Sequence, residues 1–66
     1  MPLITVQMFP GKSRSQLDEL VDRLTDAYLD TCGRPGQGRS SVWVVLQEVP
    51  AERWAVGGKL APESDA

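Results

Sequence analysis

The chain has 66 residues and a net charge of −2. A chain of this length forms one domain and buries only about 60% of its unfolded surface. It therefore needs a disulfide, a bound metal or a partner chain for stability. One cysteine, Cys32, and no histidine exclude an intrachain disulfide and leave no metal or zinc site. The acidic balance, with no basic leader and no long apolar run, predicts a cytoplasmic protein that binds neither nucleic acid nor membrane.

Two strands and one helix are expected along the chain. Alternating apolar residues predict a strand over residues 3–9, ended by the turn Pro10-Gly11. Ser13 and Gln16 then form a capping box at the start of a helix. The helix carries an apolar stripe made of Leu17, Leu20, Val21, Leu24, Ala27, Tyr28 and Thr31. Gly33 suits the left-handed residue that closes a helix, and Pro35 forbids its continuation.

The second half of the chain predicts a loop, a strand and a hairpin. Residues 33–40 form a polar, glycine-rich loop, and residues 41–49 form a strand with apolar side chains on both faces. Residues 53–56 followed by Gly57-Gly58 predict a short hairpin. We therefore expect a single domain over residues 1–60 and a flexible tail over residues 61–66. The strand–helix–strand order predicts a parallel α/β unit, β-α-β, and its uncovered sheet face predicts at least a dimer.

Most chemistry is excluded by the residues that are missing. Without histidine there is no Ser-His or Cys-His nucleophile pair. The run from Gly33 to Gly38 follows a helix and lacks the Lys-Ser/Thr of a phosphate loop, so a helix stop with a flexible turn is the favoured interpretation. Cys32, at the end of the apolar stripe, is expected to be a buried packing residue.

Pro2 is the unusual feature, because Met1-Pro2 leads directly into a strand. Initiator methionine is commonly removed before a residue as small as proline, which would leave a secondary amine on a rigid ring. An α-amino group has a pKa near 7.7–8.0, and an apolar pocket or a nearby cation lowers that pKa. Such an amine would be a general base poised near physiological pH. Alternatively, Pro2 is merely a tolerated second residue.

The whole chain resembles the 4-oxalocrotonate tautomerase family. The resemblance runs from Met1 to about Leu60 through Met1-Pro2-Leu3-Ile4, Phe9-Pro10-Gly11-Lys12-Ser13, the helical stripe, Val42-Trp43-Val44-Val45 and Arg53-Trp54-Ala55-Val56-Gly57-Gly58. It implies a β-α-β fold with a C-terminal hairpin, dimers with four-stranded sheets, and a homohexamer built as a trimer of dimers. It also implies a cofactor-free isomerase in which Pro2 moves a proton on a small anionic 2-hydroxydienoate or related enol or 2-oxo acid.

The resemblance assigns roles to further residues. Lys12 stands where the family usually has an arginine that binds a substrate carboxylate, and lysine keeps the charge without the bidentate fork. Trp43 stands where well-known members have a second arginine, so an indole N–H or an arginine of a neighbouring subunit (Arg34, Arg39 or Arg53) would have to act instead. Trp54 matches the aromatic residue over the base.

Two alternatives remain open at this stage. Relatives that hydrate or dehalogenate unsaturated acids pair a protonated proline with a carboxylate, for which Glu48 and Glu52 are the obvious candidates here. The replacement of both arginines also suits a non-catalytic subunit of the same fold. Whether a carboxylate reaches Pro2 would separate the first alternative from a tautomerase.

Overall fold

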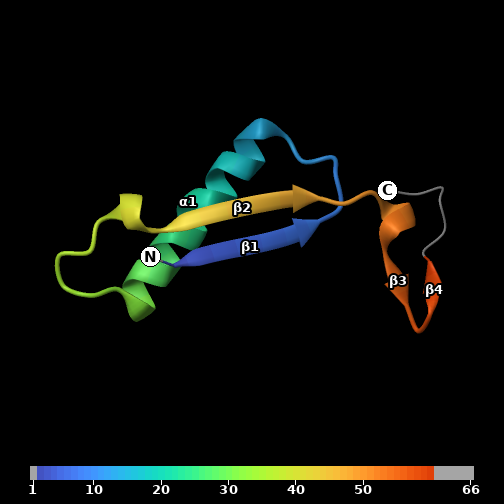
Figure 1. Cartoon of the computed structure of the whole chain (residues 1–66). Helices are drawn as coiled ribbons and strands as arrows, with labels where there is room; N and C mark the ends of the chain where they lie inside the picture. The colour runs from blue at the N-terminus through green and yellow to red at the C-terminus, as the bar shows by residue number, and fades with distance from the viewer. Residues whose placement is uncertain (1, 61–66) are drawn as a thin grey trace.

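The computed structural model describes residues 2–60, which form one helix against a two-stranded sheet, followed by a small hairpin (Figure 1). The order is β1 (Leu3–Met8), α1 (Arg14–Cys32), β2 (Trp43–Glu48), β3 (Ala55–Val56) and β4 (Lys59–Leu60). Short 3-10 turns, η1 (Arg39–Ser41) and η2 (Ala51–Arg53), precede β2 and β3. The predicted β-α-β arrangement with a C-terminal hairpin is confirmed.

Strands β1 and β2 are parallel, as predicted, and pair from Leu3 with Trp43 to Met8 with Glu48. Backbone hydrogen bonds continue the pairing beyond both ends of the strands. The Trp43 N–H donates to the Pro2 carbonyl at 3.0 Å, and the Val49 N–H donates to the Met8 carbonyl at 2.8 Å. The start of the described chain is therefore fixed to the start of β2.

Helix α1 begins as predicted and ends differently. The Ser13 hydroxyl accepts from the Gln16 N–H at 3.1 Å, and the Gln16 side chain accepts from the Ser13 N–H at 2.9 Å, which completes the capping box. The left-handed conformation predicted for Gly33 is wrong, because its φ is −69°. Glycine suits this position for a different reason: a Cβ here would lie 2.5 Å from the Leu29 carbonyl oxygen.

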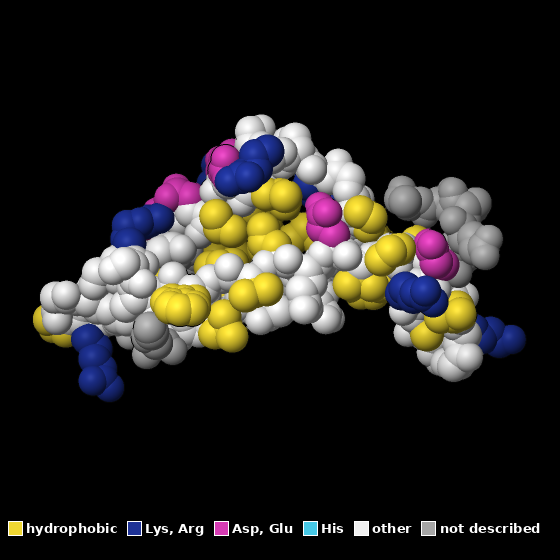
Figure 2. Space-filling model, turned by 45° about the horizontal axis from the view of Figure 1, so that its top comes forward, with side chains coloured by type: hydrophobic (Ala, Val, Ile, Leu, Met, Phe, Trp, Pro, Cys, Tyr) yellow, Lys and Arg dark blue, Asp and Glu magenta, His cyan; other side chains and the backbone are white. Residues whose placement is uncertain are grey.

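The helix covers only one face of the sheet. Thr25 is the buried residue of α1, and its hydroxyl donates to the Val21 carbonyl at 2.8 Å. On the opposite face Leu3, Trp43 and Val45 are 62%, 56% and 42% exposed. Figure 2 shows further hydrophobic side chains in a hollow where α1 meets β2. A single chain thus leaves much apolar surface in water, as the sequence pattern predicts.

The C-terminal hairpin projects away from the β-α-β unit (Figure 1). Gly57 and Gly58, with φ values of 63° and 85°, form its two-residue turn. The predicted hairpin starts too early, since Arg53 belongs to η2. The tail predicted over residues 61–66 lies outside the described residues. Within residues 2–60, no helix has the length and apolar character needed to cross a membrane.

Candidate active site

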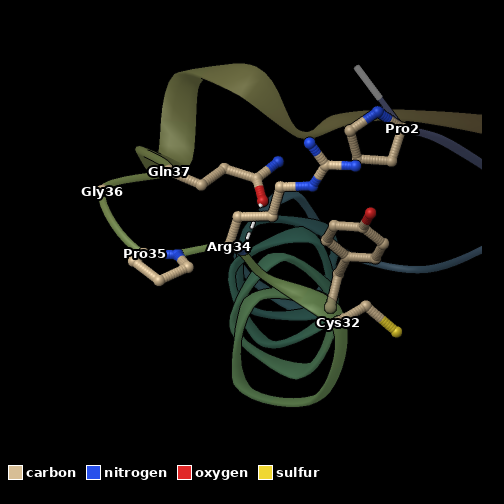
Figure 3. A pocket seen from close by; sticks show the side chains of 7 residues that line it. Pro2, Cys32, Arg34, Pro35, Gly36 and Gln37 are labelled. Carbon is tan, nitrogen blue, oxygen red and sulfur yellow. Dashed lines mark hydrogen bonds between the residues drawn. The ribbon is translucent and has the colours of Figure 1, made fainter.

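The topology brings Pro2 to the C-terminal end of α1. The helix runs antiparallel to β1 and β2, so the loop that follows it lies beside the start of β1 (Figure 1). An open concavity of about 630 Å³ is found there. Its lining consists of Pro2, Tyr28, Cys32, Arg34, Pro35, Gly36 and Gln37. The site is therefore built from the first strand, the end of the helix and the loop after it (Figure 3).

Pro2 is held by its backbone rather than by its ring. Its carbonyl accepts the Trp43 N–H at 3.0 Å, and its side chain is half-buried at the concavity. This hydrogen bond is made by the Pro2 carbonyl oxygen and does not involve the proline nitrogen. A freed amine here would belong to a residue that lines the concavity.

The loop on the other side of the concavity is a defined turn, not the flexible turn favoured by the sequence. The Gln37 N–H donates to the Arg34 carbonyl at 3.0 Å, with Pro35 second and Gly36 third at a φ of 83°. These are the features of a type II β-turn, which requires a positive φ at its third residue. The Gln37 side chain braces the turn by accepting from the Arg34 N–H at 3.0 Å and donating to the Ser41 hydroxyl at 3.0 Å.

The turn carries the only charged side chain among the seven lining residues. In Figure 3 the Arg34 guanidinium extends from the turn toward Pro2. Among residues 2–60, none of the acidic side chains lines the concavity. The site therefore combines a ring that can expose an amine with a cation suited to an anionic ligand.

Arg39 lies elsewhere in this chain. Its guanidinium pairs with two carboxylates of α1, donating to Asp22 at 2.6 Å and to Asp26 as well. These contacts hold η1 against the helix. They also engage the guanidinium at a point outside the lining of the Pro2 concavity.

Lys12 and Trp54 lie at the opposite end of the sheet from Pro2. Lys12 is exposed in the turn after β1. The Trp54 indole N–H donates to the Val49 carbonyl at 3.0 Å, just beyond β2, and its ring packs edge-on against Phe9 at 5.0 Å. Since a strand rises about 3.3 Å per residue, the six residues of β1 separate these side chains from Pro2 by about 20 Å. One chain does not bring them to its own Pro2.

Trp43 and Cys32 differ in how they relate to the concavity. Trp43 pairs with Leu3 beside Pro2, but its side chain is exposed and is not among the lining residues. Cys32 lines the concavity and is exposed, so its predicted burial is wrong in the single chain. Figure 3 shows its sulfur turned away from Pro2.

Glu48 and Glu52, the acidic residues that hydration would need, lie away from Pro2. Glu48 is the last residue of β2 and pairs with Met8, and Glu52 lies in η2. Both are therefore at the same end of the sheet as Lys12. Among residues 2–60, no three histidine, cysteine, aspartate or glutamate side chains come together as a metal site would require.

Sequence reasoning missed the parts that Arg34 and Tyr28 play in forming this site. The sequence suggests Arg34 only as a residue donated by a neighbouring subunit, and it places Tyr28 in the apolar stripe. Two signals were present. In a β-α-β unit the loop after the helix returns to the start of the first strand, and Pro-Gly at the centre of Arg34-Pro35-Gly36-Gln37 is typical of a type II turn.

Comparison with known proteins places the chain in a family. The model of the tautomerase enzyme family matches residues 2–62. A probable tautomerase of Ralstonia nicotianae is 42% identical over all of this chain and 87% of its own length. The 2-hydroxymuconate tautomerase of Pseudomonas putida is 30% identical over 96% of this chain and 95% of its own. The chain belongs to the tautomerase enzyme family, and its similarity to solved 4-oxalocrotonate tautomerase homologues places it in the 4-oxalocrotonate tautomerase family.

A solved structure agrees in fold. The heterohexameric 4-oxalocrotonate tautomerase of Chloroflexus aurantiacus is 32% identical and covers 91% of this chain and 92% of its own, with a TM-score of 0.74. Oligomers, including hexamers, thus occur among proteins of this fold. Family membership supports a tautomerase type of function for this chain.

Proposed function

We propose that this chain is a cofactor-free tautomerase that moves a proton on a 2-hydroxydienoate or a related enol or 2-oxo acid. Pro2, freed by removal of Met1, is the general base. The observation that carries the proposal is the position of Pro2, half-buried at a concavity whose seven described lining residues include one cation and no acidic side chain. Membership of the family and similarity to a 2-hydroxymuconate tautomerase support the reaction class.

The reaction needs one group that alternately accepts and donates a proton. The neutral Pro2 nitrogen takes the proton of the 2-hydroxyl group. The oxygen electron pair forms the carbonyl while the conjugated double bonds shift along the chain of carbons. The protonated amine then returns the proton to a carbon of the conjugated system, which gives an α,β-unsaturated 2-oxo acid. The proton count is unchanged, and no redox step occurs.

The surroundings of Pro2 favour a neutral amine. Both partial burial and a neighbouring cation disfavour a positive charge, so each lowers the pKa of the freed amine from the ordinary range of about 7.7–8.0. The half-buried ring and the Arg34 side chain supply these two influences. An amine whose pKa lies near or below neutral pH is substantially unprotonated when substrate arrives.

We propose that a second chain contributes the remaining residues of the site. Lys12 would hold a substrate carboxylate and Trp54 would cover the base, yet both lie at the far end of the sheet in their own chain. The exposed face around Trp43 needs a cover, which a second copy of this chain supplies. We propose a homohexamer, built as a trimer of dimers with four-stranded sheets. In this assembly Trp43 lines an active site that lies between subunits.

Hydration or dehalogenation of an unsaturated acid is the alternative reaction. Activation of water requires a carboxylate beside the substrate, and no acidic residue of the described part of the chain, residues 2–60, lines the Pro2 concavity. This favours proton transfer over hydration or dehalogenation. A non-catalytic subunit would keep the fold and assembly without any turnover that depends on Pro2.

The test uses protein whose mass confirms the loss of Met1, beside the Pro2→Ala variant. Ketonisation of 2-hydroxymuconate is followed by absorbance, and the product is identified by mass. We expect a rate well above buffer that falls in the variant, because its N-terminal alanine keeps an α-amine but not one held in a rigid ring. Equal rates for the two proteins would contradict the proposal, and a product heavier by one water would favour hydration.

A further inference from the structure

Arg34 has a place in the chain that no other arginine shares. It lies in the same concavity as Pro2, on the turn that closes the far side (Figure 3). The six other lining residues carry no charged side chain. An anion that enters the concavity therefore meets this guanidinium next to the proposed base.

The guanidinium is also available for a ligand. Within residues 2–60, all the salt bridges use Arg14, Arg23 or Arg39, and none uses Arg34. Arg39 makes the contrast clear, because Asp22 and Asp26 already neutralise it. A cation without a carboxylate partner beside a cavity can bind an anionic ligand without first breaking an ion pair.

Hydrogen bonds hold the backbone of Arg34 in place before any ligand binds. Its N–H donates to the Gln37 side chain and its carbonyl accepts the Gln37 N–H, each at 3.0 Å. The Ser41 hydroxyl holds the Gln37 amide at 3.0 Å and itself donates to the Gly38 carbonyl at 2.7 Å. A fixed backbone lowers the entropy cost of placing the side chain on a ligand.

We infer that Arg34 binds the substrate carboxylate next to the hydroxyl group that Pro2 deprotonates, within the same subunit. This inference rests on the proposed function and names the residue that grips the reacting end. A guanidinium offers two parallel N–H donors that match a carboxylate. Negative charge also develops on the neighbouring 2-oxygen as its proton leaves, and a fixed cation stabilises that charge in the transition state.

The experiment compares Arg34→Gln and Arg34→Lys with the parent on two substrates, 2-hydroxymuconate and 2-hydroxy-2,4-pentadienoate. Both substrates keep the carboxylate next to the hydroxyl, and only the first has a second carboxylate. Arg34→Gln should lower kcat/KM about tenfold or more on both, the scale of a lost hydrogen bond to a charged group. Arg34→Lys should recover part of the loss, because it keeps the charge without the fork.

A matched control removes the same charge elsewhere. Arg23 is exposed on α1, where it pairs with Glu19, so Arg23→Gln should leave kcat/KM unchanged on both substrates. A pH profile gives a further readout that a structural role would not move. Loss of the Arg34 charge should raise the apparent pKa of the Pro2 amine, which shifts the rising limb of kcat/KM to higher pH.

The outcomes separate this inference from the proposed function. A parent enzyme that is active through Pro2, with Arg34→Gln equal to the parent on both substrates, would overturn the role of Arg34 alone. A loss on 2-hydroxymuconate only would assign Arg34 to the distant carboxylate and also overturn the inference. An inactive parent would count against the proposed function itself.

Discussion

The backbone N–H of Trp43 donates a 3.0 Å hydrogen bond to the carbonyl of Pro2. This bond joins the proposed base to the first residue of β2 and makes no use of the Pro2 ring. The position of the amine is therefore set by strand pairing, and its chemistry is set by the concavity beside it.

Folding of the chain should accordingly not depend on the Pro2 ring. Pro2→Ala keeps the carbonyl that Trp43 binds, so we expect the free energy of unfolding to change by about 0.5 kcal/mol or less. Urea unfolding and sedimentation of the two proteins measure this. A large loss of stability or of assembly would mean that any loss of activity in this variant reflects misfolding.

Lys12 should act on binding more than on chemistry. If it holds a carboxylate equally in the ground state and the transition state, Lys12→Ala raises KM on 2-hydroxymuconate and leaves kcat nearly unchanged. Lys12→Arg should lower KM below that of Lys12→Ala, because arginine restores the charge and adds the fork. An unchanged KM in Lys12→Ala would place Lys12 outside the site.

The distance between Lys12 and Pro2 also makes a prediction about mixed assemblies. Lys12 lies about 20 Å from Pro2 of its own chain, so a working site would take the two residues from different subunits. Pro2→Ala and Lys12→Ala subunits, unfolded together and refolded, should regain activity above the mean of the two separate variants when 2-hydroxymuconate is well below KM, where the rate reports kcat/KM. Activity at that mean would show that the two residues do not meet across subunits.

The turn that carries Arg34 depends on the conformation of Gly36. Its φ of 83° is one that side chains disfavour, although open space surrounds it, so Gly36→Ala should cost about 1–2 kcal/mol from backbone conformation alone. Gly38, with a φ of −89° and similar space, offers a matched control. Gly38→Ala should be neutral or slightly stabilising. Equal changes in the free energy of urea unfolding for the two variants would contradict the left-handed conformation of Gly36.

The uncovered sheet face should control assembly. Val45 is 42% exposed at the centre of β2, two residues from the exposed Trp43 on the same face, so Val45→Glu should shift sedimentation toward smaller species. Gln47→Glu adds the same charge on the same face, at a position where Gln47 already bonds the polar Gln7 side chain, and should have a smaller effect. A parent that sediments as a monomer would contradict a homohexamer.

Local patterns predicted the elements well, because their causes are local. The alternation in the first strand, the capping box of Ser13 with Gln16 and the turn at Gly57-Gly58 each depend on residues close together in sequence. Parallel pairing followed from the length of the crossover. Strand ends differed by one or two residues, as hydrogen bonding fades at the ends of elements.

The candidate site was harder to predict because it depends on which residues distant in sequence lie close together in the fold. Nothing local shows that Asp22 and Asp26 come within reach of Arg39, while Arg34 extends toward Pro2. The exposure of Cys32 likewise depends on how far α1 reaches past the sheet. The sequence identified the type of residues needed, and the fold decided which arginine lies beside Pro2.

The central claim is that a free Pro2 amine is the base, and the most direct test changes only that nitrogen. The chain from Pro2 onward can be made by chemical synthesis, once with a free amine and once with the amine acetylated. Acetylation removes basicity and leaves every side chain in place. We predict that 2-hydroxymuconate ketonisation falls about 100-fold or more in the acetylated protein while assembly is unchanged. Equal rates from the two proteins would contradict the account.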